Sequence, residues 1–89
     1  MAKKRRKLNK DFERKIYSSK KNVELVLAKI YDIDDEDIQK EYMSAFNKVV
    51  YLYYQLKEDY DREGFCDNSE ELLTSYKNAF NLFESEFEI

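Results

Sequence analysis

The chain has 89 residues and a formal net charge of −3 at neutral pH, with 43% hydrophobic and 39% charged residues. This length predicts one domain with one hydrophobic core. The longest apolar run, residues 49–54, is far shorter than the roughly 20 residues that a membrane-spanning helix needs, so no transmembrane segment is predicted.

Composition also bears on location and assembly. The single cysteine, Cys66, excludes an internal disulfide framework and a cysteine-based metal site. No apolar stretch follows the first basic residues, so no secretory signal is predicted and a reducing, cytoplasmic location is expected. The abundance of lysine, asparagine, tyrosine and glutamate is typical of AT-rich genomes, such as those of low-GC bacteria and their phages. Because a chain of this length builds only a modest core, dimerisation is an alternative route to stability.

Charge is distributed unevenly along the chain. Residues 1–29 carry 11 basic and three acidic side chains, a local charge of +8, whereas residues 30–89 carry five basic and 16 acidic ones, or −11. Residues 1–8 are predicted to form a disordered tail with five consecutive cations: Lys3, Lys4, Arg5, Arg6 and Lys7. Such a run can contact nucleic acid or another anionic surface. Pairing with acidic residues of the same chain or of a protein partner is one alternative, and a nuclear import signal is another.

The first helix is predicted over residues 9–31, with Asn9 as its N-cap. Its core-facing residues recur at alternating spacings of four and three, which places them on one stripe. The stripe consists of Phe12, Ile16, Ser19, Val23, Val26 and Ile30. Ser18 and Ser19 compete for backbone hydrogen bonds, which allows a kink or a later helix start at this point.

The second helix is predicted over residues 35–62. Asp34 is its expected N-cap, and the carboxylates of residues 35–37 suit the positive end of the helix dipole. Ile33 and Ile38 take the positions of a hydrophobic staple. The apolar seam of this helix consists of Tyr42, Phe46, Val49, Tyr53, Leu56 and Tyr60.

Gly64 is the only glycine in the chain and marks the end of the second helix. A glycine after the last helical residue lets the backbone turn left-handed. Phe65 would then contact Tyr60, as in a Schellman ending.

The third helix is predicted over residues 69–87, with a capping box formed by Asn68 and Glu71. Its seam consists of Leu73, Tyr76, Phe80, Phe83 and Phe87. The loop of residues 64–68 is short, so the second and third helices should form an antiparallel hairpin with the first helix packed across it. The sequence therefore predicts an all-α, small three-helix bundle in a single domain over residues 9–89.

Composition argues against catalysis and cofactor binding. The chain has no histidine, so it lacks the usual general base near neutral pH and histidine metal ligands. Cys66 lies near Glu63, Asp67 and Glu70, whose negative charges do not favour a reactive thiolate. One glycine cannot form a phosphate-binding loop of a known type. We therefore expect neither enzyme activity nor a cofactor.

The acidic stretch between the first two helices matches a calcium-binding loop only in part. Counting Asp32 as the first position places Asp34 and Glu36 at ligand positions. However, Asp37 replaces the required glycine and Met43 replaces the final glutamate. Helix capping explains these carboxylates without a metal, so no metal site is predicted.

Binding is the expected activity, and the basic N-terminal segment is the first candidate for it. The candidate nucleic-acid contacts are Lys3, Lys4, Arg5, Arg6, Lys7, Lys10, Arg14, Lys20 and Lys21. Such contact would be electrostatic and largely independent of base sequence. A helix-turn-helix is not favoured, because Asp67, Glu70 and Glu71 at the Gly64 turn would repel phosphates. A basic amphipathic helix lying on an anionic membrane is a further alternative.

A protein partner is the second candidate. Off its main seam, the second helix also carries Met43, Val50, Tyr51 and Tyr54. These residues indicate either a wide apolar face that touches both neighbouring helices or an exposed patch that binds a partner. The candidate partner-binding residues are Tyr51, Tyr54, Glu70, Glu71, Glu84 and Glu86. A solvated helix surface is the alternative explanation for the four carboxylates.

The sequence thus predicts a small, non-catalytic binding or regulatory protein that associates with nucleic acid. One alternative is an inhibitor or immunity factor, of the type found in phages and mobile elements, that binds a host protein through the acidic second and third helices. Another is a self-associating assembly protein, in which the cationic segment of one copy pairs with the acidic segment of a second copy.

Overall fold

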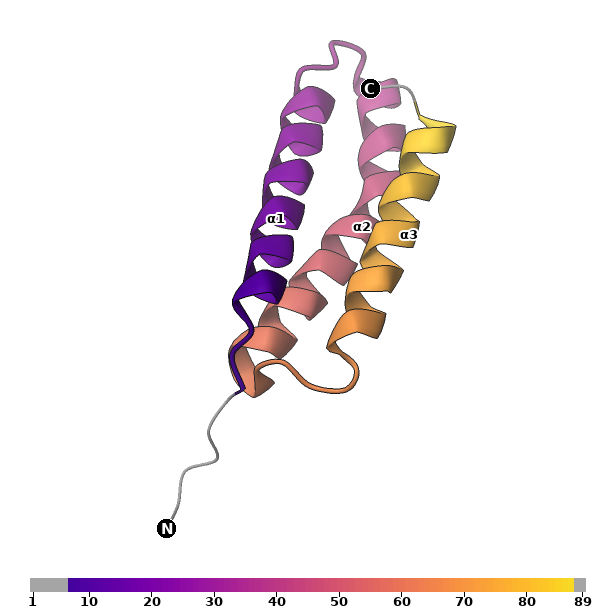
Figure 1. Ribbon diagram of the computed structural model, residues 1–89. Coiled ribbons are helices and arrows are strands. Elements are labelled where there is room, and N and C mark those ends of the chain that lie inside the picture. Colours follow the sequence, from indigo (N-terminus) through magenta and orange to yellow (C-terminus); the bar gives the residue numbers. More distant parts are fainter. Residues whose placement is uncertain (1–6, 88–89) are drawn as a thin grey trace.

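Three helices run up, down and up in the computed structural model, which describes residues 7–87 (Figure 1). They are α1 (Lys10–Tyr31), α2 (Glu36–Glu63) and α3 (Ser69–Glu86). α2 packs closely against α3 and also against α1. The predicted all-α bundle and the hairpin of the second and third helices are therefore confirmed. Of the tail expected over residues 1–8, residues 1–6 lie outside the described part of the chain.

The core is built from the predicted helical stripes. All six stripe residues of α1 are buried, and the α2 seam is buried except for the half-buried Tyr42. In α3, Leu73, Tyr76 and Phe83 are buried, while Phe80 and Phe87 are half-buried. Burial of these apolar side chains is the main force that holds the helices together.

The start of α1 follows the prediction. The Asn9 side-chain oxygen accepts a hydrogen bond from the Phe12 N–H at 3.0 Å, as an N-cap does. The helix then continues without interruption past Ser18, so the later start that the two serines allowed is wrong. The Ser19 hydroxyl donates to the Lys15 carbonyl at 2.8 Å, which satisfies this buried side chain inside the helix.

The start of α2 lies one residue later than predicted. Asp35, not Asp34, is the N-cap, and its carboxylate accepts hydrogen bonds from the N–H groups of Asp37 at 2.9 Å and Ile38 at 3.1 Å. Several neighbouring acidic residues are competent caps by residue type. The position of the cap is therefore decided by the surrounding structure and not by the side chain alone.

Gln39 replaces the predicted hydrophobic staple as the link across this loop. Its side-chain amide donates to the carbonyls of Ile30 and Tyr31, both at 3.2 Å, at the end of α1. With Asp35 as the cap, Ile33 and Ile38 no longer occupy the two staple positions. Two carbonyl groups at the end of α1 thus accept hydrogen bonds from a side chain in the first turns of α2, which links the two helices.

The end of α2 has the predicted glycine but a different hydrogen-bond partner. Gly64 has φ 76° and ψ −160°, a conformation that is essentially restricted to glycine. The predicted Schellman ending is wrong, because the Phe65 N–H donates to the Lys7 carbonyl at 2.6 Å and not to a carbonyl of α2. The Phe65 ring packs on Phe12, with ring centroids 5.0 Å apart. The segment before α1 and the α2–α3 loop therefore hold each other in place.

The predicted capping box at the start of α3 is also wrong. Asn68 is the N-cap residue, but its side chain makes no capping hydrogen bond and instead accepts from the Cys66 thiol at 2.9 Å. The Ser69 hydroxyl accepts from the Cys66 N–H at 2.9 Å. Asn68 has φ −92° and ψ 0°, outside the extended region that capping residues usually adopt, so its oxygen is not aimed at the first turn of the helix.

Candidate functional site

The candidate basic side chains on α1 and just before it are exposed to solvent. Lys7, Lys10, Arg14, Lys20 and Lys21 are all exposed, whereas Lys3, Lys4, Arg5 and Arg6 lie outside the described residues. Spacings of four and seven residues place Lys10, Arg14 and Lys21 on one line along the helix. The structure therefore brings three of the candidate nucleic-acid contacts together on one outer face, with Lys20 around the helix from them.

Few of these cations are neutralised within the described residues. Arg14 lies 3.8 Å from Asp11, but both side chains are more than four-fifths exposed, so this pair contributes little. The Lys21 ammonium lies 5.2 Å from the centroid of the Tyr17 ring, and Tyr17 is itself exposed. The ion pairs found elsewhere in residues 7–87 join Lys57 and Arg62 to carboxylates of α2.

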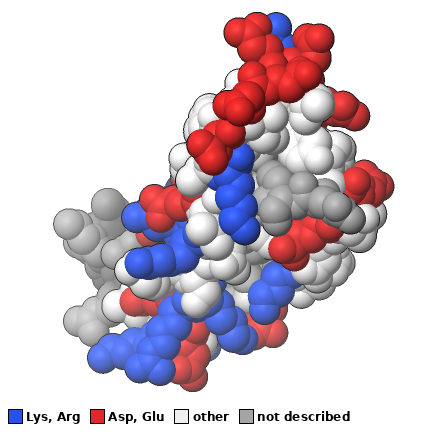
Figure 2. Space-filling model, turned by 90° about the horizontal axis from the view of Figure 1, so that it is seen from above, with Lys and Arg blue, Asp and Glu red and all other residues white. Residues whose placement is uncertain are grey.

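Charge is separated between α1 and the other two helices. Residues 7–31 carry seven basic and three acidic side chains, whereas residues 32–87 carry five basic and 15 acidic ones. Seen from the end of the bundle that holds the α1–α2 loop, the largest cluster of acidic side chains lies at one edge, and most Lys and Arg side chains lie toward the opposite half (Figure 2). Such separation gives α1 a more positive electrostatic potential than the other two helices.

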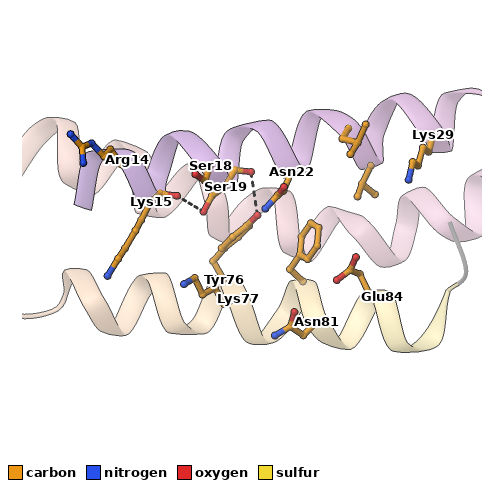
Figure 3. Close-up of a pocket in the computed structure, with 13 residues that line it drawn as sticks. Arg14, Lys15, Ser18, Ser19, Asn22, Lys29, Tyr76, Lys77, Asn81 and Glu84 are labelled. Carbon is orange, nitrogen blue, oxygen red and sulfur yellow. Dashed lines mark hydrogen bonds between the residues drawn. The ribbon is translucent and has the colours of Figure 1, made fainter. Parts of the chain in front are cut away.

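A groove lies between α1 and α3, where the two helices make few direct contacts (Figure 3). It has a volume of about 630 Å³, which is within the usual range of ligand-binding pockets. All of its lining residues come from these two helices: Arg14, Lys15, Ser18, Ser19, Asn22, Leu25, Val26, Lys29, Tyr76, Lys77, Phe80, Asn81 and Glu84.

The floor of the groove is closed by Tyr76 and Ser19. The Tyr76 hydroxyl donates to the Ser19 carbonyl at 3.2 Å, which joins α3 directly to α1 (Figure 3). Burial raises the pKa of Tyr76 to about 12. The phenol is therefore neutral near neutral pH and does not serve as a general base. Val26 and Phe80 complete the floor with apolar surface.

The rim of the groove is cationic. Lys15 and Lys29 from α1 and Lys77 from α3 line it, with Glu84 as the only carboxylate among its lining residues. The Lys15 side chain extends from α1 toward α3, so its ammonium lies near the same end of the groove as Lys77 (Figure 3). Glu84 and Lys29 lie toward the other end (Figure 3). An apolar floor with positive edges suits a ligand that has both apolar and anionic groups.

Known proteins offer no template for this groove. No protein-family model, curated protein or solved structure matches the chain. Within residues 7–87, no group of three or more acidic or cysteine side chains is arranged to hold a metal ion. No helix in the same range has the length and apolar character needed to cross a membrane. The site is therefore interpreted from the chemistry of its own side chains.

The two candidate tyrosines of α2 are not part of the core. Tyr51 is 60% exposed and accepts a hydrogen bond from the Gln55 side chain at 2.9 Å, while Tyr54 is 55% exposed. Met43 and Val50 are half-buried and pack against the core, as a wide apolar face requires. That explanation therefore accounts for Met43 and Val50, but Tyr51 and Tyr54 remain available on the surface.

The four candidate carboxylates do not form one surface. Glu70 and Glu71 are exposed in the first turn of α3, far along the helix from the other two. Glu84 lines the groove toward α1, whereas Glu86 lies beside a small hollow between α3 and α2. A partner that contacted all four carboxylates at once, as the sequence suggested, would have to surround α3.

The groove itself was not foreseen from the sequence. Lys15 and Lys77 were not among the candidate binding residues, although their positions flank the buried stripes of α1 and α3. A line of polar residues beside a stripe is visible from helical spacing: Lys15, Ser18, Asn22 and Lys29. Which neighbouring helix such a line faces depends on the handedness of the bundle, and spacing alone does not supply it.

Proposed function

We propose that this chain is a non-catalytic binding protein that associates with nucleic acid through α1 and the basic segment before it. The support is the separation of charge, with exposed cations on α1 and a strongly acidic remainder. Lysine and arginine side chains bind phosphates by displacing condensed counterions, without a fixed geometry. Binding is therefore expected to be sensitive to salt and tolerant of base sequence.

The exposed line of Lys10, Arg14 and Lys21 suits this role. A phosphate backbone can lie along these side chains, because none of them is held in a strong ion pair with a described residue. Tyr17 lies beside Lys21 and offers a ring on which an unpaired base can stack. The acidic first turn of α3 argues against insertion of that helix into a groove of DNA.

A protein inhibitor or immunity factor is the second candidate function. Tyr51 and Tyr54 favour it, because two exposed tyrosines next to each other on α2 are typical of protein interfaces. Their rings would supply rigid contact area for a partner. This candidate does not require the cations of α1, so substitutions on α1 distinguish the two.

The main test is the binding of labelled single-stranded and duplex oligonucleotides by the full chain, measured by fluorescence anisotropy over a range of salt concentrations. The logarithm of the binding constant should fall linearly with the logarithm of salt concentration. On duplex DNA the slope should be about 0.9 for each phosphate contacted. Absence of binding at low salt, or binding that does not depend on salt, would contradict the proposal.

A pair of double variants separates α1 from general charge effects. Lys20→Gln with Lys21→Gln removes two exposed cations of α1, and the salt slope should fall by about 0.9 for each phosphate that the chain no longer neutralises. Lys40→Gln with Lys48→Gln removes two exposed cations of α2 and changes the net charge equally. The α2 variant should bind like the unaltered chain, and an equal decrease in both variants would show that α1 is not the interface.

A further inference from the structure

α1 and α3 each lack a packing neighbour on one side. Both pack against α2, but they make few contacts with each other, and their facing sides enclose the open groove. Short loops make α1 and α3 each antiparallel to α2, so α1 and α3 point in the same direction (Figure 1). In a four-helix bundle of alternating direction, this position is filled by a helix that runs antiparallel to both.

The dimensions of the groove fit one additional helix. Its lining residues on α1 extend from Arg14 to Lys29, which corresponds to about 22 Å at 1.5 Å per residue. A helix of about 15 residues has this length. The floor offers Val26 and Phe80, and Leu25 on the rim is 57% exposed, which is a large apolar side chain left in water. These residues are the apolar contacts that the fourth position of a bundle requires.

Charge specifies what kind of helix fits. Arg14, Lys15, Lys29 and Lys77 line the groove against one carboxylate, Glu84. A helix with acidic residues beside its apolar stripe would complement this rim, whereas a basic helix would be repelled. We propose that the groove binds an acidic amphipathic helix of a protein partner, which completes a four-helix bundle.

The arrangement of the cations also predicts the direction of the bound helix. Lys15 and Lys77 lie toward the end of the groove at which α3 begins (Figure 3). A helix that runs antiparallel to α1 and α3 ends there, and its C-terminal carbonyls carry partial negative charge. The same two lysines then pair with acidic side chains of the last turns and with the helix dipole. This inference does not depend on nucleic-acid binding, which is proposed for the outer face of α1. Arg14 lies where that face meets the groove, and the groove substitutions described below leave it unchanged.

A second copy of the chain is a less suitable occupant. The main apolar stripes of all three helices are already buried in the core of their own molecule, and the exposed Tyr51 and Tyr54 of the acidic α2 cover only about one helical turn, much less than the length of the groove. Nucleic acid is also less suitable, since phosphates make no use of an apolar floor. Both remain outcomes that the experiment separates.

The test uses a synthetic helical peptide of about 15 residues with leucines at positions i, i+4, i+7 and i+11 and glutamates beside them. The matched probe has lysine in place of each glutamate. Isothermal titration calorimetry with the full chain should give roughly micromolar binding of the acidic peptide and none of the basic peptide. Amide NMR shifts should move at the groove, around Ser19, Val26 and Phe80. Absence of binding by the acidic peptide, or equal binding of both, would overturn the proposal.

Two pairs of variants locate the binding. Leu25→Glu should weaken binding of the acidic peptide by about tenfold. Leu82→Glu is the control and should leave this binding unchanged, because Leu82 of α3 is 58% exposed but lies outside the groove. The double variant Lys15→Glu with Lys77→Glu should also weaken binding of the acidic peptide by about tenfold, and it should allow the basic peptide to bind. Lys40→Glu with Lys48→Glu makes the same change of net charge on α2 and should have no such effect.

Two other results would assign the groove differently and overturn the proposal. If the chain alone forms a dimer in analytical ultracentrifugation, and Leu25→Glu dissociates it, the occupant is a second copy. If Lys15→Glu with Lys77→Glu abolishes oligonucleotide binding and the acidic peptide displaces the oligonucleotide, the occupant is nucleic acid. Peptide binding that is abolished in the groove variants while oligonucleotide binding persists would support two separate sites.

Discussion

α3 has two sides that differ sharply in how they are packed. Toward α2, its aromatic rings interlock with those of the neighbouring helix: Phe83 lies 4.8 Å from Phe46, and Phe87 lies 4.8 Å from Tyr42, between ring centroids. Toward α1, one hydrogen bond from Tyr76 crosses to Ser19, and the rest of the boundary is the open groove. The comparison indicates that pairing with α2 supplies most of the stability, which leaves the α1–α3 side available for binding.

Phe46→Ala should have the largest effect on this comparison. Phe46 is fully buried and its ring contacts both Phe80 and Phe83, so its removal leaves a cavity at the α2–α3 contact. The expected loss is about 3–5 kcal/mol in the free energy of unfolding, measured by urea denaturation. Leu25→Ala, at a position on the groove whose side chain is 57% exposed, removes apolar surface from the α1–α3 side and should cost far less. Equal losses of unfolding free energy in the two variants would contradict the difference in packing between the two sides of α3.

The second-largest effect is expected from alkaline pH, which should weaken the contact between α1 and α3. The pKa of Tyr76 is raised to about 12 by burial, whereas tyrosine in an unfolded chain ionises near about pH 10. The neutral phenol therefore stabilises the folded state below about pH 10, and this contribution disappears as the pH rises through about 12. The free energy of unfolding should fall by on the order of 2 kcal/mol across that window.

Tyr76→Phe supplies the control for this dependence. The variant has no phenol to ionise at this position, so its stability should decline less steeply above about pH 10. Burial also raises the pKa of Tyr53, which contributes in the same direction and remains in the variant. Urea denaturation of both proteins at about pH 8 and about pH 11 measures the difference. An identical decline in both would show that Tyr76 is not responsible.

The smallest expected effect concerns how α2 begins beside α1. Asp35→Ala removes two hydrogen bonds to the first turn of α2 and should cost about 1 kcal/mol in the free energy of unfolding. Asp34→Ala changes the neighbouring residue, which makes no such bonds, and should cost only a few tenths. Thermal unfolding of the two variants would decide between the two caps. A larger loss for Asp34→Ala would restore the cap expected from the sequence.

Helical periodicity was enough to predict the three helices and their buried stripes. The stripe of α1 from Phe12 to Ile30 was predicted residue by residue, because burial on one face imposes spacings of three and four. The ends of the helices were harder. Asp34 and Asp35 are equally suitable caps by residue type, and Phe65 bonds to Lys7, a residue of the distant N-terminal segment that no local pattern indicates.

The candidate site was predictable only in part. The exposed cations of α1 followed from composition and spacing, but the groove depends on which polar lines of α1 and α3 face each other. Glu84 and Glu86 show what helical geometry could have added. Residues two apart are separated by roughly 200° around a helix, so these carboxylates could have been assigned to different sides of α3.

The small contact between α1 and α3 also bears on how quickly the chain folds. The two well-packed pairs, α1 with α2 and α2 with α3, are neighbours in sequence that are joined by loops of a few residues, so their closure costs little entropy. The pair farthest apart in sequence contributes least to the packing. Proteins dominated by such local contacts fold in roughly microseconds to milliseconds, and stopped-flow or temperature-jump measurements should place this chain in that range.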